Sequence, residues 1–221
     1  MNETKVNAMK KLRGIMPARA VSLTEAYMLA ERQATELLKL LGIRSVPVPV
    51  SRIGELPRIE IQVESRDYMV DKSGFSHRWE NGRWLIVINK HDVRGRRRFT
   101  LAHEFKHVLD HSIASLAYAR LGHGDGQRRD RQIEHICHHF AACLLMPRPV
   151  VKRAWTSGIQ DLEALSELFK VSPMAMQIRL DYLGLTDQER PIATYFRRDH
   201  SFDLPLLTPD SFEVPVFGAI N

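Results

Sequence analysis

The pattern His-Glu-x-x-His, formed by His103, Glu104 and His107, constrains this chain more than any other feature. Apolar residues at helical spacing place the pattern inside one long helix, predicted from Arg97 to about Tyr118. Residues four apart on a helix share a face, so the imidazoles of His103 and His107 can bind one metal ion. Glu104 points about 100° away around the helix axis, where it can contact a metal-bound water without binding the metal. We therefore predict a metal site, most simply zinc, with Glu104 as its catalytic residue.

A catalytic zinc site needs a third protein ligand and an open position for water. His111 is close in sequence, but it lies about 12 Å beyond His103 along the helix axis and cannot reach the same ion. Glu134 borders the apolar stripe of the next predicted helix, where a carboxylate is costly to bury unless a positive group binds it. We favour Glu134 as the third ligand, with a carboxylate stabilised by the helix dipole as its alternative role. Three neighbouring histidines are less favoured: His135, His138 and His139.

Three short segments before this helix predict the strands of a small sheet. Residues 58–64 alternate apolar and polar side chains, which is typical of a half-buried strand. Residues 68–70 and 84–88 also suit strands, and Asn81-Gly82 predicts a type I′ hairpin turn before the latter. We expect a mostly antiparallel sheet.

Helical spacing predicts further helices on both sides of the metal-binding pattern. Ser22 and Glu25 form a capping box at the start of a helix that ends near Gly42. A buried helix around Ile133 is expected to stop near Pro147. A C-terminal helix pair follows, at about 161–169 and 173–183. Strands followed by helices indicate an α+β fold.

We predict one domain over residues 21–185, including the helix pair 161–183, between two appendages. Residues 1–20 are basic and show no clear periodicity, so a flexible arm is expected there. Residues 186–221 contain scattered prolines and predict an extended tail. The hydrophobic fraction of 44% and the charged fraction of 26% exclude a wholly disordered chain.

The sequence predicts a cytoplasmic protein with no membrane partner. It has no run of about 18 apolar residues and no signal peptide pattern. Cys137 and Cys143 are about 9 Å apart along one predicted helix, too far for a disulfide, which suits a reducing compartment. The net charge of +6 could attract nucleic acid or an acidic partner, although a solvated basic surface is the commoner reason for such a charge.

Two blocks of sequence together resemble the ImmA/IrrE family of zinc metallopeptidases. The first is Arg98-Phe-Thr-Leu-Ala-His-Glu-Phe-Lys-His107, and the second is Glu134 followed by Phe140-Ala-Ala-Cys-Leu-Leu-Met-Pro147. The resemblance spans residues 22–185. It implies a zincin-like fold and one zinc ion with a bound water. The ligands that it implies are His103, His107 and Glu134.

The chain departs from the family pattern at two places. The family usually has Leu-Gly where this chain has Phe105-Lys106, which puts in question how closely another segment packs there. It often has Ala-Asn where this chain has Cys137-His138, so His138 is either an added site residue or a bystander. The sequence does not single out an oxyanion stabiliser among Tyr118, His138, His139 and tail residues, and it leaves zinc, manganese and iron open as the native metal.

The resemblance also implies a task, because members of the family cut helix-turn-helix repressors of mobile elements or stress regulons. We therefore expect a zinc endopeptidase that hydrolyses a peptide bond in a DNA-binding repressor and relieves repression. Glu104 would act as general base and then as general acid. Trp84–Ile88 is the strand that we expect to pair with an extended peptide substrate.

Two other functions remain open at this point. The helix pair 161–183 could bind DNA directly as a helix-turn-helix, with Lys170 and Arg179 facing the phosphates. Acidic residues on the same helices would repel phosphates: Asp161, Glu163, Glu167 and Asp181. The chain could also be an inactive peptidase that binds a partner without cutting it.

Overall fold

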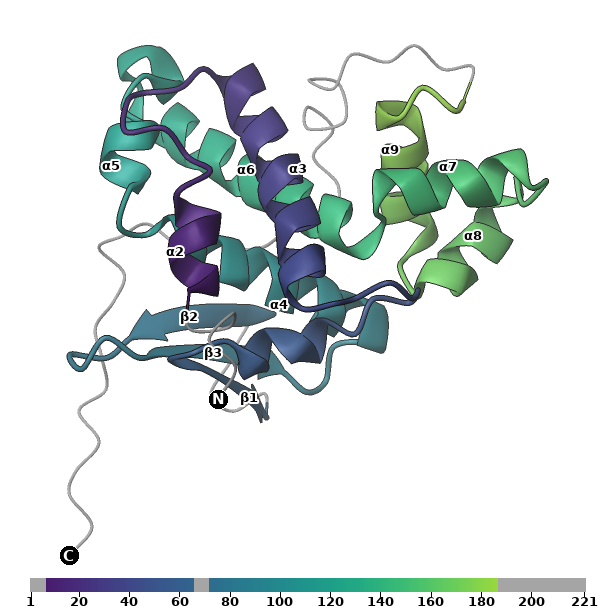
Figure 1. Cartoon of the computed structure of the whole chain (residues 1–221), viewed down its shortest axis with the longest axis horizontal. Coiled ribbons are helices and arrows are strands. Elements are labelled where there is room, and N and C mark those ends of the chain that lie inside the picture. Colours follow the sequence, from purple (N-terminus) through teal and green to yellow (C-terminus); the bar gives the residue numbers. More distant parts are fainter. Residues whose placement is uncertain (1–6, 66–71, 187–221) are drawn as a thin grey trace, which may run out of the picture.

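The computed structural model describes residues 7–65 and 72–186. It is a mixed α+β structure in which a small sheet lies against one side of a group of helices (Figure 1). The strands are β1 (Ile59–Glu64), β2 (Gly74–Arg78) and β3 (Trp84–Asn89). The α-helices are α2 (Ala8–Arg13), α3 (Leu23–Leu40), α4 (Arg94–Asp110), α5 (Ala114–Ala117), α6 (Gly126–Leu145), α7 (Arg148–Thr156), α8 (Leu162–Phe169) and α9 (Pro173–Tyr182), with 3-10 helices at Val50–Glu55 and Leu121–Gly124.

The sheet has the order β1-β3-β2 and is mixed rather than mostly antiparallel. β2 and β3 form an antiparallel hairpin, whereas β1 runs parallel to β3, with Ile59 opposite Trp84. The expectation of a mostly antiparallel sheet is wrong because one of the two strand pairs is parallel. β3 lies between β1 and β2, and two reversals of the chain give it the direction of β1, which no local sequence pattern encodes. The expected strand at 68–70 lies outside the described residues.

Because β3 is the central strand, it cannot accept a peptide substrate. It pairs with β1 along Trp84–Asn89 and with β2 along Trp84–Ile88. Its residues are mostly buried, as suits an apolar run between two neighbours. The expectation that Trp84–Ile88 pairs with substrate is therefore wrong. The strands at the edges are β1 and β2.

The turn between β2 and β3 contains Asn81-Gly82, but it is not of type I′. The connection is closed by the N–H of Trp79, which donates to the carbonyl of Arg83 at 2.8 Å. Only Gly82 of the Asn81-Gly82 pair has a positive φ, of 76°, whereas type I′ requires two. The loop is longer than the two-residue connection for which that turn type is suited.

The core lies between α3, α4 and α6 and one face of the sheet. α3 begins where the capping box predicts, because the hydroxyl of Ser22 accepts a hydrogen bond from the N–H of Glu25 at 3.2 Å. α6 ends at Leu145, just before Pro147, and begins earlier than predicted, at Gly126. The rings of Phe105 on α4 and Phe140 on α6 are 6.2 Å apart at the centre of this layer.

α4 ends at Asp110 and does not continue to Tyr118 as predicted. The chain turns after His111, and the hydroxyl of Tyr118 comes back to donate a hydrogen bond to the buried carboxylate of Asp110. The Nζ of Lys106 lies 2.6 Å from the same carboxylate. Both contacts reach Oδ2, and a buried carboxylate is costly without such partners, which favours the turn over a continued helix.

Two helices were not predicted. Residues 8–13, expected within a flexible arm, form α2, with Ala8 and Leu12 buried. Arg13 anchors this helix by donating to the carbonyls of Leu109 and Val108 at 3.0 and 3.2 Å. α7 follows Pro147 directly and carries a proline in its first turn, where proline is favoured.

α7, α8 and α9 gather at one side of the molecule (Figure 1). α8 and α9 lie where the helix pair was predicted, and the hydroxyl of Ser172 accepts from the N–H of Ala175 at the start of α9. Residues 187–221, and with them nearly all of the expected tail, lie outside the described residues. Within the described ranges, no helix is both long and apolar enough to cross a membrane.

Candidate metal centre

α4 and α6 bring three predicted ligands together. The Nε2 atoms of His103 and His107 are 3.1 Å apart. The carboxylate of Glu134 lies 3.1 Å from His103 Nε2 and 3.3 Å from His107 Nε2, through different oxygens. The two histidines come from successive turns of α4, and Glu134 projects from the adjacent α6.

The spacing and chemistry of these three groups fit a zinc ion. Ligand atoms about 2.0–2.1 Å from a tetrahedral zinc are roughly 3.4 Å from one another, close to the separations of 3.1 and 3.3 Å found here. A carboxylate and an unprotonated imidazole nitrogen are both hydrogen-bond acceptors. The two imidazole nitrogens and the carboxylate, which face one another here, therefore need a cation or a proton between them.

The centre is partly open to solvent. The side chain of His103 is 4% exposed, whereas those of His107 and Glu134 are 28% and 25% exposed. The side chains of His107 and Glu134 are therefore partly accessible to solvent, whereas that of His103 is enclosed by protein. Partial access to solvent is compatible with a catalytic metal site, which keeps one position open for water.

The local electrostatics favour an anionic Glu134. Burial alone would raise the pKa of this carboxyl group, but the hydrogen bonds from His103 and His107 hold its pKa well below its ordinary value. The carboxylate is thus ready to bind a cation without first losing a proton.

Glu104 lies in the buried part of α4, directly after His103, and is 5% exposed. His111 lies away from the centre, with its ring packed edge-on against Trp84 at 5.0 Å. His138 packs on the ring of His103, at 4.7 Å between centroids. Burial lowers the pKa of His138 well below its ordinary value, so its ring is neutral at pH 7.

One neighbour of the centre was missed by the sequence analysis. The sulfur of Cys137 lies 3.7 Å from Nδ1 of His107, on the side of the ring opposite the ligand nitrogen. The sequence spacing could have indicated this position, because Cys137 is three residues after Glu134 and so shares a face of α6 with it.

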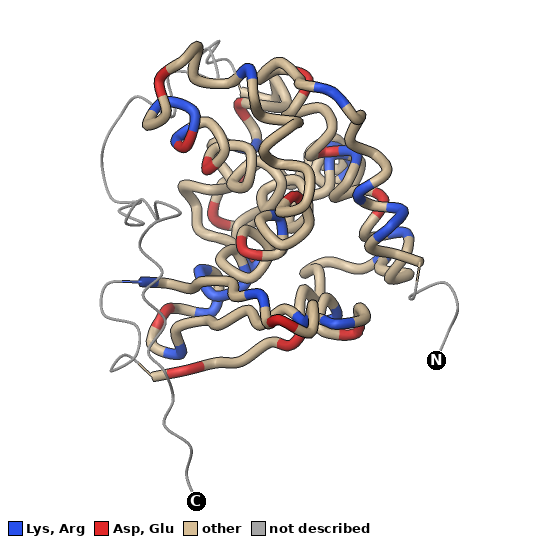
Figure 2. Tube along the Cα trace, turned by 90° about the vertical axis from the view of Figure 1, so that its left-hand side faces the viewer, with Lys and Arg blue, Asp and Glu red and all other residues tan. Residues whose placement is uncertain are grey.

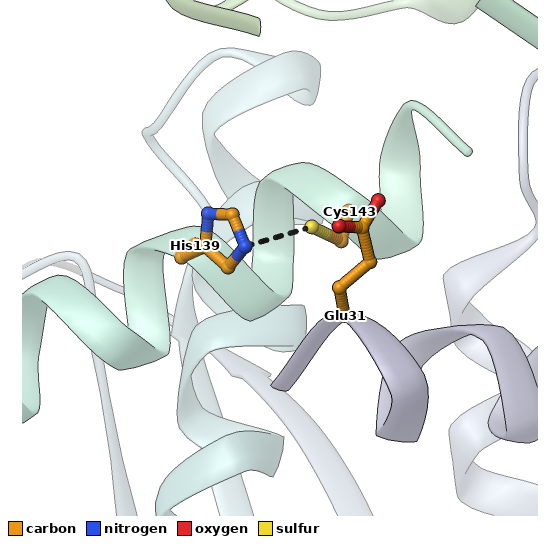
Figure 3. Close-up of side chains that lie close together, drawn as sticks. All are labelled: Glu31, His139 and Cys143. Carbon is orange, nitrogen blue, oxygen red and sulfur yellow. Dashed lines mark hydrogen bonds between the residues drawn. The ribbon is translucent and has the colours of Figure 1, made fainter. Parts of the chain in front are cut away.

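A second cluster of possible ligand atoms lies between α3 and α6 (Figure 3). Glu31, His139 and Cys143 converge there, with His139 Nε2 3.4 Å from Cys143 Sγ. The buried guanidinium of Arg179 reaches into the same cluster, 3.1 Å from Glu31 Oε1 and 3.3 Å from Cys143 Sγ.

Arg179 makes this second cluster a poor metal site. Its fixed positive charge already neutralises Glu31, and a metal ion would have to bind beside it. Burial also raises the pKa of Cys143 to about 12, whereas metals bind the deprotonated thiolate. We therefore regard the cluster as a structural contact between α3, α6 and α9. Both cysteines are free, as predicted.

A helix with His-Glu-x-x-His beside a helix that offers a carboxylate, set against a small sheet, is typical of the metallopeptidase class. Residues 58–181 match the family model described as the IrrE N-terminal-like domain, peptidase family M78. This match covers more than half of the chain, and the protein belongs to that family. The predicted relationship to the ImmA/IrrE family is thereby confirmed.

Two curated relatives carry the name radiation response metalloprotease IrrE. The one from Deinococcus radiodurans is 31% identical over 118 residues, which are 50% of this chain and 34% of that protein. The one from Deinococcus deserti is 36% identical over 84 residues, 38% of this chain and 30% of that protein. The matched region thus spans about a third of the length of each of these relatives.

The structure is also similar to that of a transcriptional regulator from Mycobacterium tuberculosis. The TM-score is 0.56 and the sequence identity 17%, over 83% of this chain and 53% of the other. At this identity the similarity concerns the fold alone.

Proposed function

We propose that this protein is a zinc-dependent endopeptidase with a zincin-like centre. The observation that carries the proposal is the convergence of His103 Nε2, His107 Nε2 and the Glu134 carboxylate within 3.1–3.3 Å of one another. Membership of a peptidase family and the names of the two Deinococcus relatives support it.

In this proposal His103, His107 and Glu134 hold the ion, which supplies Lewis acidity to a peptide carbonyl and to water. Glu104 takes a proton from the attacking water and then gives it to the leaving amine. It lies on the same helix as the two histidines and is buried, so α4 fixes its backbone position relative to them.

We propose that the substrate pairs with the free edge of β2. This strand packs closely against α4: a Cβ added to Gly74 would lie 2.5 Å from Cγ2 of Thr100, one turn before His103. In the described part of the chain β2 pairs only with β3, so its other edge can accept an extended peptide by strand addition.

We further propose a DNA-binding repressor as the substrate and the cytoplasm as the compartment. The family resemblance supports the substrate, since its members are proteases of transcriptional regulators. The absence of a spanning helix in the described ranges and the free cysteines are compatible with the compartment. Residues 186–221 remain a predicted appendage of the domain.

Direct DNA binding by α8 and α9 is not favoured. Arg179, which was expected to face phosphates, is 2% exposed and holds Glu31. Lys170 is paired with Glu167. Basic and acidic residues are interspersed along the described chain (Figure 2), and Arg98 is used internally, donating to the carbonyls of Phe169 and Val48.

The proposal is tested with a panel of purified helix-turn-helix repressors, with casein as a non-specific comparison. Wild-type protein loaded with zinc should cut one repressor at a defined bond, detected by mass spectrometry, and leave casein intact. Glu104→Gln should lower this cleavage by at least about 100-fold while it retains zinc, because Glu104 moves protons and does not bind the metal. Cleavage that persists in Glu104→Gln or in excess chelator would contradict the proposal, and zinc binding without any cleavage would favour an inactive, partner-binding protein.

A further inference from the structure

We propose that Cys137 is a positioning residue, which holds the imidazole of His107 so that Nε2 faces the metal centre. The inference rests on the proposed function, because it concerns the second nitrogen of a proposed zinc ligand. It assigns a role to one of the two residues at which this chain departs from the Ala-Asn often found in its family.

The contact that carries the inference runs between α6 and α4. Cys137 Sγ lies 3.7 Å from His107 Nδ1, and Cys137 is 1% exposed. The other nitrogen of the same ring, Nε2, lies 3.1 Å from His103 Nε2 and 3.3 Å from the Glu134 carboxylate. The ring is thus held between the sulfur on one side and the centre on the other.

The chemistry of imidazole determines which atom donates and which accepts in this contact. A histidine binds a metal through an unprotonated nitrogen, so the proton of the neutral ring must be on the other nitrogen. For His107 that nitrogen is Nδ1, and the sulfur of Cys137 lies where it can accept the hydrogen bond. A partner on this nitrogen fixes both the tautomer and the orientation of a metal-binding histidine.

His103 offers an internal comparison. Its Nδ1 is buried and, in the described part of the chain, has no hydrogen-bond partner. The ring of His103 is instead packed between those of His107 and His138, at 4.8 and 4.7 Å. Of the two imidazoles, only that of His107 therefore has a polar group, in the described part of the chain, next to its Nδ1. Loss of Cys137 should affect the orientation of His107 and not that of His103.

The position of Cys137 on α6 adds a second consequence. Glu134 and Cys137 are three residues apart, so one helical turn supplies both a proposed ligand and the group that orients another. The centre is then assembled by a single packing contact, between this turn of α6 and the middle of α4.

The test compares Cys137→Ala with Cys143→Ala, which removes the other buried thiol from the same helix. Zinc affinity is measured by competition with a chromophoric chelator, and unfolding is followed in excess chelator to record the stability of the metal-free fold. Cys137→Ala should weaken zinc binding about 10–100-fold, and Cys137→Ser, which keeps an acceptor, should recover part of the loss. Cys143→Ala should lower the unfolding temperature but change zinc affinity less than about twofold.

Cobalt in place of zinc gives a readout that general destabilisation does not change. The visible bands of the bound Co²⁺ should shift in Cys137→Ala and not in Cys143→Ala, and wild-type protein should show no thiolate-to-cobalt charge-transfer band. Three results would each overturn this inference without overturning the proposed function. They are wild-type zinc affinity in Cys137→Ala, an equal loss of zinc affinity in both cysteine variants, and a thiolate-to-cobalt charge-transfer band, which would make Cys137 a ligand. A wild-type protein that binds no zinc overturns the proposed function as well.

Discussion

Single residues in this protein have roles that their type does not reveal. Lys106 is an example, because a lysine on a helix is usually solvated, and here it is fully buried. Its Nζ lies 2.6 Å from Gln33 Oε1 and 2.6 Å from Asp110 Oδ2. In the place where the family usually has glycine, this chain thus has a buried ion pair within α4, and the lysine of that pair also donates a hydrogen bond to Gln33 on α3.

This burial predicts a large effect of breaking the pair. Lys106→Met should lower the free energy of unfolding by about 3–5 kcal/mol, because it leaves Asp110 charged and buried without its cation. The double variant Lys106→Met with Asp110→Asn should recover much of the loss. Urea unfolding in the presence of chelator measures both values, and a single variant as stable as wild type would show that the pair is not essential to the fold.

At the scale of elements, sequence patterns located the helices around the centre better than they located the sheet. The spacing of His103 and His107 and the apolar stripe beside Glu134 are local properties, and they place α4 and α6 correctly side by side. The parallel pairing of β1 with β3 and the end of α4 at Asp110 depend on contacts between segments far apart in sequence, and no local pattern encodes them. The burial of Arg179 was missed for the same reason, since its partners lie on α3 and α6.

The corrected sheet gives a prediction about substrate pairing. In the β2–β3 hairpin, the N–H of Trp79 donates to Arg83 and that of Asn89 to Ser73. Because hydrogen-bonded pairs alternate in an antiparallel ladder, the N–H of Ser76 points to the free edge. Ser76→Pro should therefore reduce kcat/KM by about tenfold or more, through the loss of one substrate hydrogen bond and local crowding.

His77→Pro is the matched comparison. The N–H of His77 points toward β3, so this substitution should destabilise the hairpin itself. Zinc affinity and unfolding temperature of Ser76→Pro should stay near those of wild type. Unchanged cleavage by a well-folded Ser76→Pro would show that substrate does not use this edge.

For the molecule as a whole, stability depends on buried polar groups that bridge the helices. His139 packs between the rings of Tyr27 and Tyr182, at 5.0 and 4.6 Å. Burial lowers the pKa of His139 to about 3. The folded protein therefore keeps this ring neutral at pH values where the unfolded chain, with a pKa near 6.5, takes up a proton.

This difference predicts the direction of an acid effect. Between about pH 6.5 and pH 3 the unfolded chain binds more protons at His139, so the folded state loses about 1.4 kcal/mol per pH unit from this group. His139→Gln removes the titration, so the unfolding free energy of wild type minus that of the variant should fall by about 2.5 kcal/mol in total as the pH falls from 6 to 4. Urea titrations in chelator at several pH values measure it, and a difference that stays constant with pH would contradict the assignment.

The central claim is that one zinc ion binds between α4 and α6 and not in the cluster between α3 and α6. It is tested most directly by the metal content of three purified proteins: wild type, Glu134→Ala and Glu31→Ala. We predict about one zinc per chain in wild type and in Glu31→Ala, and almost none in Glu134→Ala. Retention of zinc by Glu134→Ala together with its loss from Glu31→Ala would contradict the account.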